Sequence, residues 1–184
     1  MLTTLAPEPQ SNPCWRRNPY RETLALPDGR RVLLRPAHRS DADALSRFFT
    51  ALSPRARLLR FHGAVNRLPD HVLQWMSTQV PQQHVAIVAL THTDDGLQQL
   101  LAEARYAIDG EGQAEFAVTV ADAWQRQGLG RALVQRLALH ARTVGVQSLH
   151  GSVLPGNEPM LQMLSGLGAT LHNDGAVVTA RLTL

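Results

Sequence analysis

Apolar residues recur along the chain with two different periods, which predict strands in some segments and helices in others. Residues 84–90 form a near-continuous apolar run, as a buried strand does, whereas residues 115–120 alternate between apolar and polar. From residue 128 to residue 144 apolar positions return every three or four residues, which predicts an amphipathic helix. The same reasoning predicts strands at residues 31–35, 84–90, 98–108, 115–120, 148–154, 169–172 and 176–183, and helices beginning near residues 40, 54, 70, 128 and 158.

The order of these elements predicts a mixed α/β domain. A chain of 184 residues is near the size of one ordinary domain with a single core, and we find no internal repeat. Residues 1–22 contain four prolines among polar residues and show no periodicity, so we predict a flexible N-terminal arm there. We therefore expect a single domain at residues 23–184.

Composition narrows the class of protein. An apolar fraction of 44% with 18% charged residues is typical of a soluble globular chain, and no apolar run approaches the ~20 residues of a membrane helix. We see no signal peptide, and the one cysteine, Cys14, cannot form an internal disulfide, so we expect a cytoplasmic protein. All 18 basic residues are arginine. Codon bias would explain the absence of lysine. A function in modifying lysines would explain it too, because the enzyme would then have no lysine of its own to modify.

The segment that follows the predicted strand 115–120 has the character of an anion site. Its loop leads directly into the helix near residue 128, where free backbone N–H groups and the helix dipole favour phosphate. Gly128 and Gly130 allow close approach of the backbone, and Arg126 and Arg131 add positive charge. A Walker loop needs a lysine, which the chain lacks, and a dinucleotide fingerprint needs a third glycine where Leu133 stands. The alternative is that the two glycines only form a turn.

The loop resembles the acetyl-CoA-binding motif of GNAT superfamily N-acetyltransferases, which reads Gln/Arg-x-x-Gly-x-Gly/Ala and is met here by Gln125, Gly128 and Gly130. A second block, from Asn157 to Gly168, is similar to a later motif of that family with several substitutions. The resemblance implies a GNAT fold, with a mixed sheet of about six to seven strands flanked by helices. It also implies that the fourth and fifth strands, 115–120 and 148–154, splay apart around acetyl-CoA.

Within the superfamily, the chain is most similar to the acetyltransferase domain of bacterial protein lysine acetyltransferases. The similar segments are Arg31–Pro36, Leu52–Pro54, Leu59–Phe61 and Ala123–Gln125. The resemblance implies transfer of an acetyl group to a primary amine, with a protein lysine as the favoured acceptor. A small amine such as a polyamine or an amino sugar is the alternative acceptor, and a non-catalytic acyl-CoA sensor is the alternative function. A homodimer is left open, and neither nucleic acid nor a membrane is expected as a partner.

The resemblance also assigns roles to residues. Backbone groups of Val118 and Val120 would line the cofactor arm and polarise the thioester carbonyl. The amides of Gln127 to Arg131 would hold the pyrophosphate, with Gln125, Arg126, Gly128 and Gly130 in the same cofactor site. Asn157 would hydrogen-bond the cofactor arm, and a helix N-cap explains that residue equally well.

The resemblance also suggests the residues of proton transfer. Glu115 is the predicted general base, because it lies on the strand that enters the loop, close to the place where several family members have a catalytic glutamate. Burial in an apolar channel would disfavour its charged form and so suit it to that role. An exposed glutamate paired with an arginine is the alternative. The family often places a tyrosine, as general acid, where this chain has Leu164, so Tyr106, Ser152 or a water would have to serve. The eight histidines show no metal-binding spacing, so no metal is expected, and only His150 merits a test.

Overall fold

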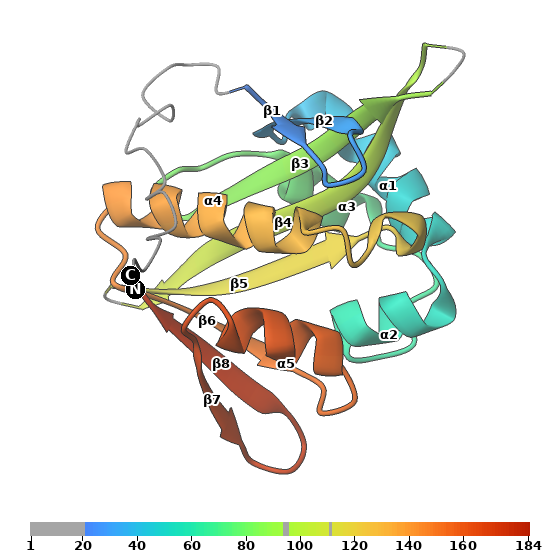
Figure 1. The fold of residues 1–184 in the computed structure, drawn as a ribbon. Coiled ribbons are helices and arrows are strands. Elements are labelled where there is room, and N and C mark those ends of the chain that lie inside the picture. The colour runs from blue at the N-terminus through green and yellow to red at the C-terminus, as the bar shows by residue number, and fades with distance from the viewer. Residues whose placement is uncertain (1–20, 94–95, 111) are drawn as a thin grey trace, which may run out of the picture.

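The computed structural model describes residues 21–93, 96–110 and 112–184, and in this part of the chain eight strands form one mixed sheet in the order β1-β2-β3-β4-β5-β6-β8-β7. Only β5 and β6 run parallel. Figure 1 shows the sheet running from β1 to the hairpin of β7 and β8. The strands are β1 (Glu22–Ala25), β2 (Arg31–Pro36), β3 (His84–His92), β4 (Gln98–Gly110), β5 (Gln113–Val120), β6 (Ser148–Val153), β7 (Thr170–Asn173) and β8 (Val178–Thr183).

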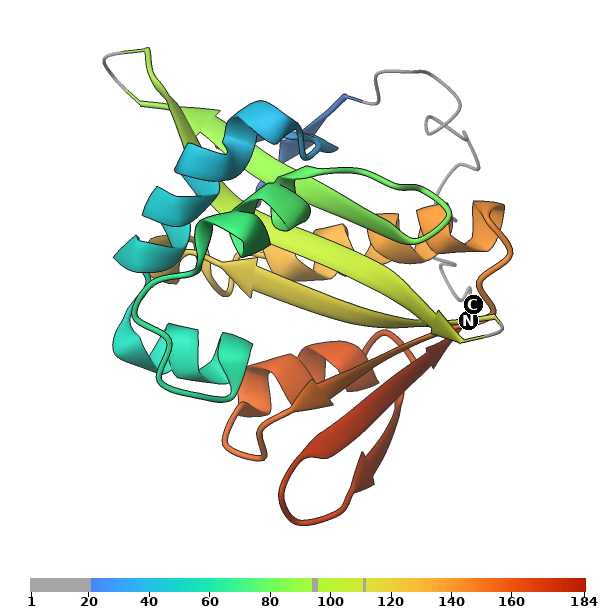
Figure 2. The same cartoon turned by 180° about the vertical axis from the view of Figure 1, so that it is seen from behind.

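Helices cover the two faces of the sheet unequally. In Figure 1, α4 and α5 lie over one face, and Figure 2 shows α1, α2 and α3 on the other. The helices are α1 (Ala42–Ala51), α2 (Pro54–Phe61), α3 (Asp70–Ser77), α4 (Leu129–Thr143) and α5 (Glu158–Ser165), with short 3₁₀ turns at Arg39–Asp41 and Asp122–Trp124. Across the described residues, no helix combines the length and the apolar character that crossing a membrane requires.

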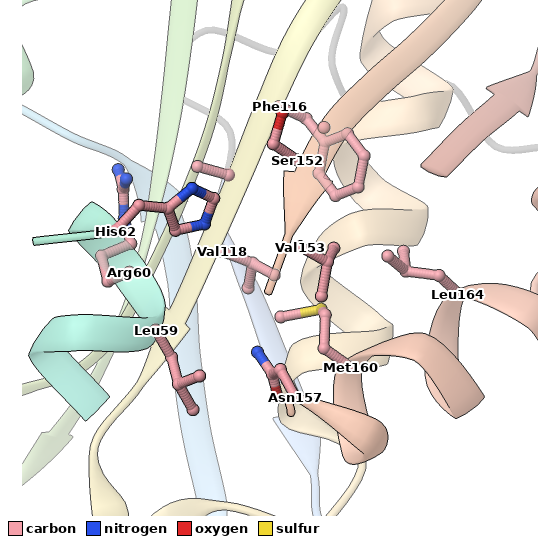
Figure 3. A pocket seen from close by; sticks show the side chains of 12 residues that line it. Leu59, Arg60, His62, Phe116, Val118, Ser152, Val153, Asn157, Met160 and Leu164 are labelled. Atoms are coloured by element: carbon pink, nitrogen blue, oxygen red, sulfur yellow. The ribbon is translucent and has the colours of Figure 1, made fainter. Parts of the chain in front are cut away.

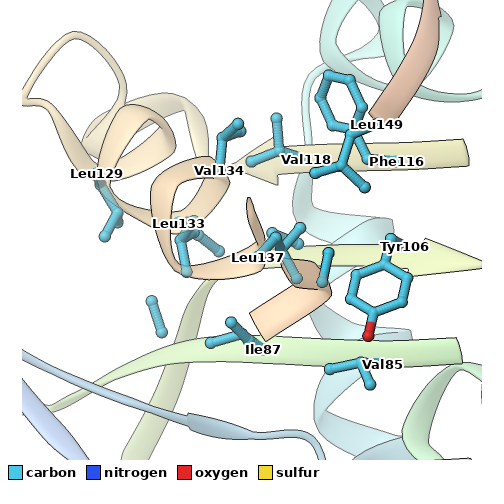
Figure 4. Packing of buried hydrophobic residues seen from close by; sticks show 14 of the residues in the cluster. Val85, Ile87, Tyr106, Phe116, Val118, Leu129, Leu133, Val134, Leu137 and Leu149 are labelled. Carbon is cyan, nitrogen blue, oxygen red and sulfur yellow. The ribbon is translucent and has the colours of Figure 1, made fainter. Parts of the chain in front are cut away.

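Two apolar clusters hold these layers together. The larger one lies between the sheet and α4, where Leu133 and Leu137 are fully buried against Ile87 and Tyr106 (Figure 4). The smaller one joins α1 and α3 to the first part of the sheet through Leu45, Phe48 and Met76, among others. Since burial of apolar surface is the main favourable term in folding, these two clusters stabilise the fold, and the larger one extends to Leu149 of β6, Leu164 of α5 and Ala180 of β8.

The predicted splay is confirmed by the strand register. Strands β5 and β6 pair over three residues, from Gln113 with Ser148 to Glu115 with His150. The next residues are Phe116 and Gly151, and a Cβ on Gly151 would lie only 2.9 Å from the carbonyl oxygen of Phe116. A glycine is therefore required where the two strands part, because any side chain there would displace that carbonyl.

The fold class is confirmed, and the strand count is higher than predicted. Seven strands match predicted ones within about three residues, and β1 is the eighth. It forms a hairpin with β2 around Gly29, whose φ of 84° suits the turn. Four residues are too few for periodicity to identify a strand, so Glu22 was assigned to the arm, whose remaining part, residues 1–20, lies outside the described residues.

Candidate active site

A pocket lies where β5 and β6 separate. Figure 3 shows that α2 and the residue after it form one wall, with Arg60 and His62, while α5 forms the other with Met160 and Leu164. The floor comes from the two strands themselves. The lining residues are Leu59, Arg60, His62, Phe116, Ala117, Val118, Gly151, Ser152, Val153, Asn157, Met160 and Leu164.

The backbone of β5 has one free edge in this pocket. Alternate residues of a strand direct their N–H and C=O groups to opposite sides, and the Ala121 amide donates to Leu101 of β4 at 2.8 Å. Val118 and Val120 therefore direct their backbone groups towards β6, beyond the last paired residues. The Val120 carbonyl accepts a hydrogen bond from Gln125 Nε2 at 3.0 Å. The free edge at Val118 provides a donor and an acceptor for an extended ligand in the gap.

The loop that follows β5 is shaped to receive an anion. Arg126 and Gly128 have φ of 60° and 83°, and Gly128 is the N-cap of α4 without a side-chain cap. Left-handed residues in such a turn make neighbouring N–H groups converge into a concavity that binds anions, and the helix dipole adds to this. A Cβ on Gly130 would contact Val120 and Met163 at an ordinary 3.6 Å, so packing alone does not require that glycine.

The charged and amide side chains of the loop are not equally available. Arg126 is exposed, whereas Arg131 donates to the Gly166 carbonyl at 2.9 Å and so ties α4 to the end of α5. Because the guanidinium of Arg131 is engaged in this way, only its backbone amide stays a candidate for phosphate binding. Gln127 Nε2 donates to the Ala123 carbonyl at 3.2 Å, and its Oε1 accepts a hydrogen bond from Arg30.

Arg30 was missed by the sequence reasoning. It belongs to the turn between β1 and β2, yet its guanidinium lies 3.9 Å from the centre of the Trp124 ring, beside the loop. It also pairs with Asp28 at 2.6 Å. Nothing in the local sequence around residue 30 indicates this approach, because it depends on how the hairpin folds onto the sheet.

Asn157 takes the N-cap position of α5 but makes no side-chain capping bond. Its side chain lines the pocket instead, as Figure 3 shows. The capping explanation therefore does not account for the residue, and its amide is free to bind a ligand.

Glu115 lies on the face of the sheet that α2 and α3 cover in part, next to the point where the strands separate. The expected burial is wrong, because the Glu115 side chain is exposed. Burial was expected from an apolar channel, and no helix covers Glu115 closely enough to bury it. Its neighbour in β6 is His150, whose Nε2 lies 2.8 Å from Asp109 Oδ2. Glu115 and His150 thus form the last pair before the strands separate, and the next residues, Phe116 and Gly151, line the pocket.

Beneath α2 lies a buried charge cluster that the sequence did not reveal. Glu103 is fully buried and contacts Arg105 Nε at 2.5 Å, while Arg60 Nη2 is 4.0 Å from its other oxygen. Burial lowers the pKa of Arg60, and the Glu103 carboxylate opposes that effect. Among the described residues, Arg60 Nε, Glu103 Oε2 and Arg105 Nη1 are buried atoms without a hydrogen-bond partner. The cluster has one more arginine than glutamate, next to the pocket that Arg60 lines.

The structure distinguishes between the candidates for the general acid that would protonate the leaving thiolate. Tyr106 is fully buried, its hydroxyl lies 2.8 Å from His140 Nδ1 in the core, and burial raises its pKa well above the usual value. It is therefore excluded as the acid. Leu164 is also fully buried and offers no proton. Ser152 lines the pocket and is exposed, so it stays a candidate.

The sequence singled out only His150 among the histidines, yet His62 lines the pocket. It ends α2 in a left-handed conformation with φ of 54°. In the described part of the chain, His, Cys, Asp and Glu side chains nowhere gather in threes as a metal-binding set.

Comparisons with known proteins agree on one family. The family model of the Acetyltransferase (GNAT) domain matches residues 31–170. The acetyltransferase PA5475 of Pseudomonas aeruginosa is 34% identical over 150 residues, covering 82% of this chain and 81% of that protein. The acetyltransferase Pat of Mycolicibacterium smegmatis is 30% identical over 156 residues, which cover 83% of this chain and 42% of Pat, so the chain spans less than half of Pat.

Solved structures give the same result. The GNAT domain of S. lividans PAT superposes with a TM-score of 0.80 at 27% identity, covering 89% of this chain and 97% of that domain. The cAMP-binding acyltransferase from Mycobacterium smegmatis superposes with a TM-score of 0.61 at 25% identity, covering 89% of this chain and 46% of that one.

Proposed function

Because the chain belongs to the GNAT acetyltransferase family, we propose that it transfers an acetyl group from acetyl-CoA to a primary amine, with a protein lysine as the favoured acceptor. One observation carries the proposal: the free backbone edge of β5 at Val118 leads directly into the turn at Gly128 that opens α4. A thioester arm along the strand and a pyrophosphate at the helix start fit these two neighbouring features.

Acetyl-CoA supplies an activated thioester, and the chain binds and orients it. Backbone groups of Val118 and Val120 line the gap and provide hydrogen bonds to the cofactor arm and the thioester carbonyl. Such preorganised donors act on charge that develops in the transition state. The loop from Gln125 to Gly130, with Arg126 and the amide of Arg131, holds the phosphates, and Asn157 contacts the arm from the other wall.

Glu115 is proposed as the general base at the acceptor face. The neutral amine attacks the carbonyl carbon, the C–S bond breaks, and the amine proton passes to the Glu115 carboxylate directly or through a water. The departing thiolate takes a proton from water, either directly or through Ser152, which passes on its hydroxyl proton and regains one from water. The Glu115 side chain is exposed, so an incoming amine can reach it.

The similarity to the acetyltransferase Pat and to S. lividans PAT supports the lysine acceptor, along with the sequence segments given above. The second candidate function is an acyl-CoA sensor without turnover. The observation that favours it is Leu164, a buried apolar residue at the place where the family often has a tyrosine.

Release of CoA thiol from acetyl-CoA tests the proposal. The full chain is assayed with lysine peptides, polyamines and amino sugars, and acetyl-CoA binding is measured in parallel. Release that depends on a lysine peptide is the expected result. Binding without release across the panel would support the sensor, and a chain that does not bind acetyl-CoA would refute both functions.

A further inference from the structure

Trp75 on α3 is unusual in being both exposed and fixed. Its side chain is 45% exposed. The ring nevertheless stacks on His84 with the ring centres 4.9 Å apart, and the guanidinium of Arg105 lies 5.0 Å from its centre. Figure 2 shows the three-helix face of the sheet on which α3 lies.

Arg105 and His84, which contact the Trp75 ring, are themselves fixed by other contacts. Arg105 is buried, contacts Glu103 at 2.5 Å and donates to the Met76 carbonyl at 3.0 Å. His84 Nε2 lies 2.9 Å from the Thr78 carbonyl oxygen. An exposed aromatic ring that is already immobilised loses little conformational freedom on binding, which is the property of an anchor residue in an interface.

The strand register connects Trp75 to the reaction centre. His84 pairs with Ala107, Ala107 with Glu115, and Glu115 with His150. Paired residues lie side by side on one face, so these four form a row across the sheet. With strands about 4.8 Å apart, the His84 end of the row lies roughly 10 Å from Glu115.

Beyond Glu115 the same face is open. Figure 2 shows β6, β8 and β7 without a helix over them on this side. Ser152 and Arg181, which share this face, are exposed. The surface is therefore wide and polar around the carboxylate, with one fixed aromatic ring at the other end of the row.

We infer that this row is a docking surface for an extended protein segment, whose acceptor lysine reaches Glu115 and whose apolar side chain packs on Trp75. The inference rests on the proposed function and names its acceptor class. Side chains alternate between the two sides of an extended chain, which advances about 3.3 Å per residue. The apolar side chain that shares the lysine's side therefore lies two or four positions from it, about 7 or 13 Å away, and these spacings bracket the roughly 10 Å of the row. A polyamine fits less well, because it has no apolar side chain to pack on the exposed part of the Trp75 ring.

Matched peptides test the inference. One set carries a lysine with leucine two or four residues before or after it, and a second set has serine in place of the leucine. Nα-acetyl-lysine amide serves as the small acceptor. In Trp75→Ala, kcat/KM for the better leucine peptide is expected to fall about tenfold, mainly through KM, as for an anchor residue at an interface. The small acceptor and the KM for acetyl-CoA are expected to stay unchanged.

Two further variants separate docking from folding. Trp75→Phe keeps an aromatic ring and is expected to retain most of the preference for leucine. Leu139→Ala removes another exposed apolar residue, 44% exposed on α4 on the opposite side of the sheet, and is expected to change neither acceptor.

Several outcomes would overturn the inference. These are equal losses in Trp75→Ala for the peptide and the small acceptor, no loss for either, or a wild type that acetylates polyamines and not peptides. In each case the chain is still an acetyltransferase. If no amine releases CoA thiol, the proposed function fails and the docking surface fails with it.

Discussion

The two sides of the gap between β5 and β6 differ in the groups that form them: backbone groups on one side and side chains on the other. The cofactor side consists of backbone, in the free edge of Val118 and the turn at Gly128. The acceptor side consists of side chains from α2, α3, β4 and β6, gathered around Glu115. A backbone site tolerates many side chains and so suits a ligand common to a whole family. A side-chain site changes with single substitutions and so suits the acceptor that differs between members.

The strongest test of the acceptor side removes its buried carboxylate. Glu103→Ala leaves Arg105 and Arg60 without their counter-charge, and we expect the free energy of unfolding to fall by about 3–5 kcal/mol. Urea denaturation measures it. Asp43→Ala, at an exposed carboxylate on α1, is expected to stay within about 0.5 kcal/mol of the wild type. A loss in Glu103→Ala as small as in this control would mean that the cluster does not fix the acceptor wall.

Glu115→Gln tests the catalytic role on the same side. The amide keeps the shape and cannot accept the amine proton, so kcat is expected to fall about 100-fold while acetyl-CoA binds as before. Steady-state kinetics and calorimetric binding separate the two. Asp70→Asn, at an exposed carboxylate on α3, is the control. Unchanged kcat in Glu115→Gln would remove the residue as the base.

Gly128→Val tests the cofactor side. A β-branched residue is strained at φ of 83°, and about tenfold weaker acetyl-CoA binding is expected. Gly145→Val is the matched control, because Gly145 has φ of 86° and lies beyond the C-terminal end of α4, at the opposite end of the helix from Gly128. Both variants carry similar strain, so equal losses of acetyl-CoA affinity would show a general effect on stability.

Asn157→Ala is expected to have the smallest effect. Loss of one ligand hydrogen bond weakens acetyl-CoA binding about fivefold, and stability is unchanged because Asn157 makes no capping bond. Ser53→Ala provides the contrast. Ser53 Oγ accepts from the Ala56 amide at 3.1 Å, so its loss is expected to cost about 1 kcal/mol of stability. Thermal unfolding with and without acetyl-CoA measures both, and a destabilised Asn157→Ala would return this residue to a structural role.

The predicted cofactor loop could be read from the sequence because its residues are contiguous. The glycine loop, the strand before it and the helix after it follow one another in the chain, so they could carry the resemblance to the GNAT family, which the family match confirms. The site residues themselves stay a prediction. The placement of Asn157 in the pocket agrees with its predicted role, which stays a prediction. Arg131 shows the limit, because its bond to Gly166 depends on how α5 packs.

The acceptor side could not be predicted in the same way. Arg60 and Glu103 come from segments with no local pattern in common, and a buried carboxylate in the middle of β4 resembles any other polar position in a strand. The burial expected for Glu115 was wrong for the same reason. Whether a strand face is covered depends on where the helices of other segments lie, and here α2 and α3 leave Glu115 open.

By itself, the sequence determined the order of strands and helices and the loop at Gly128, because each follows from short-range periodicity or from a contiguous motif. The splay was expected only from the family resemblance, and the register of β5 and β6 shows it. Only the tertiary structure decided that Trp75 stands in line with Glu115, that Tyr106 is buried in the core and that His62 reaches the pocket. These depend on strand register and helix packing, which join residues distant in the chain through contacts that no local pattern encodes.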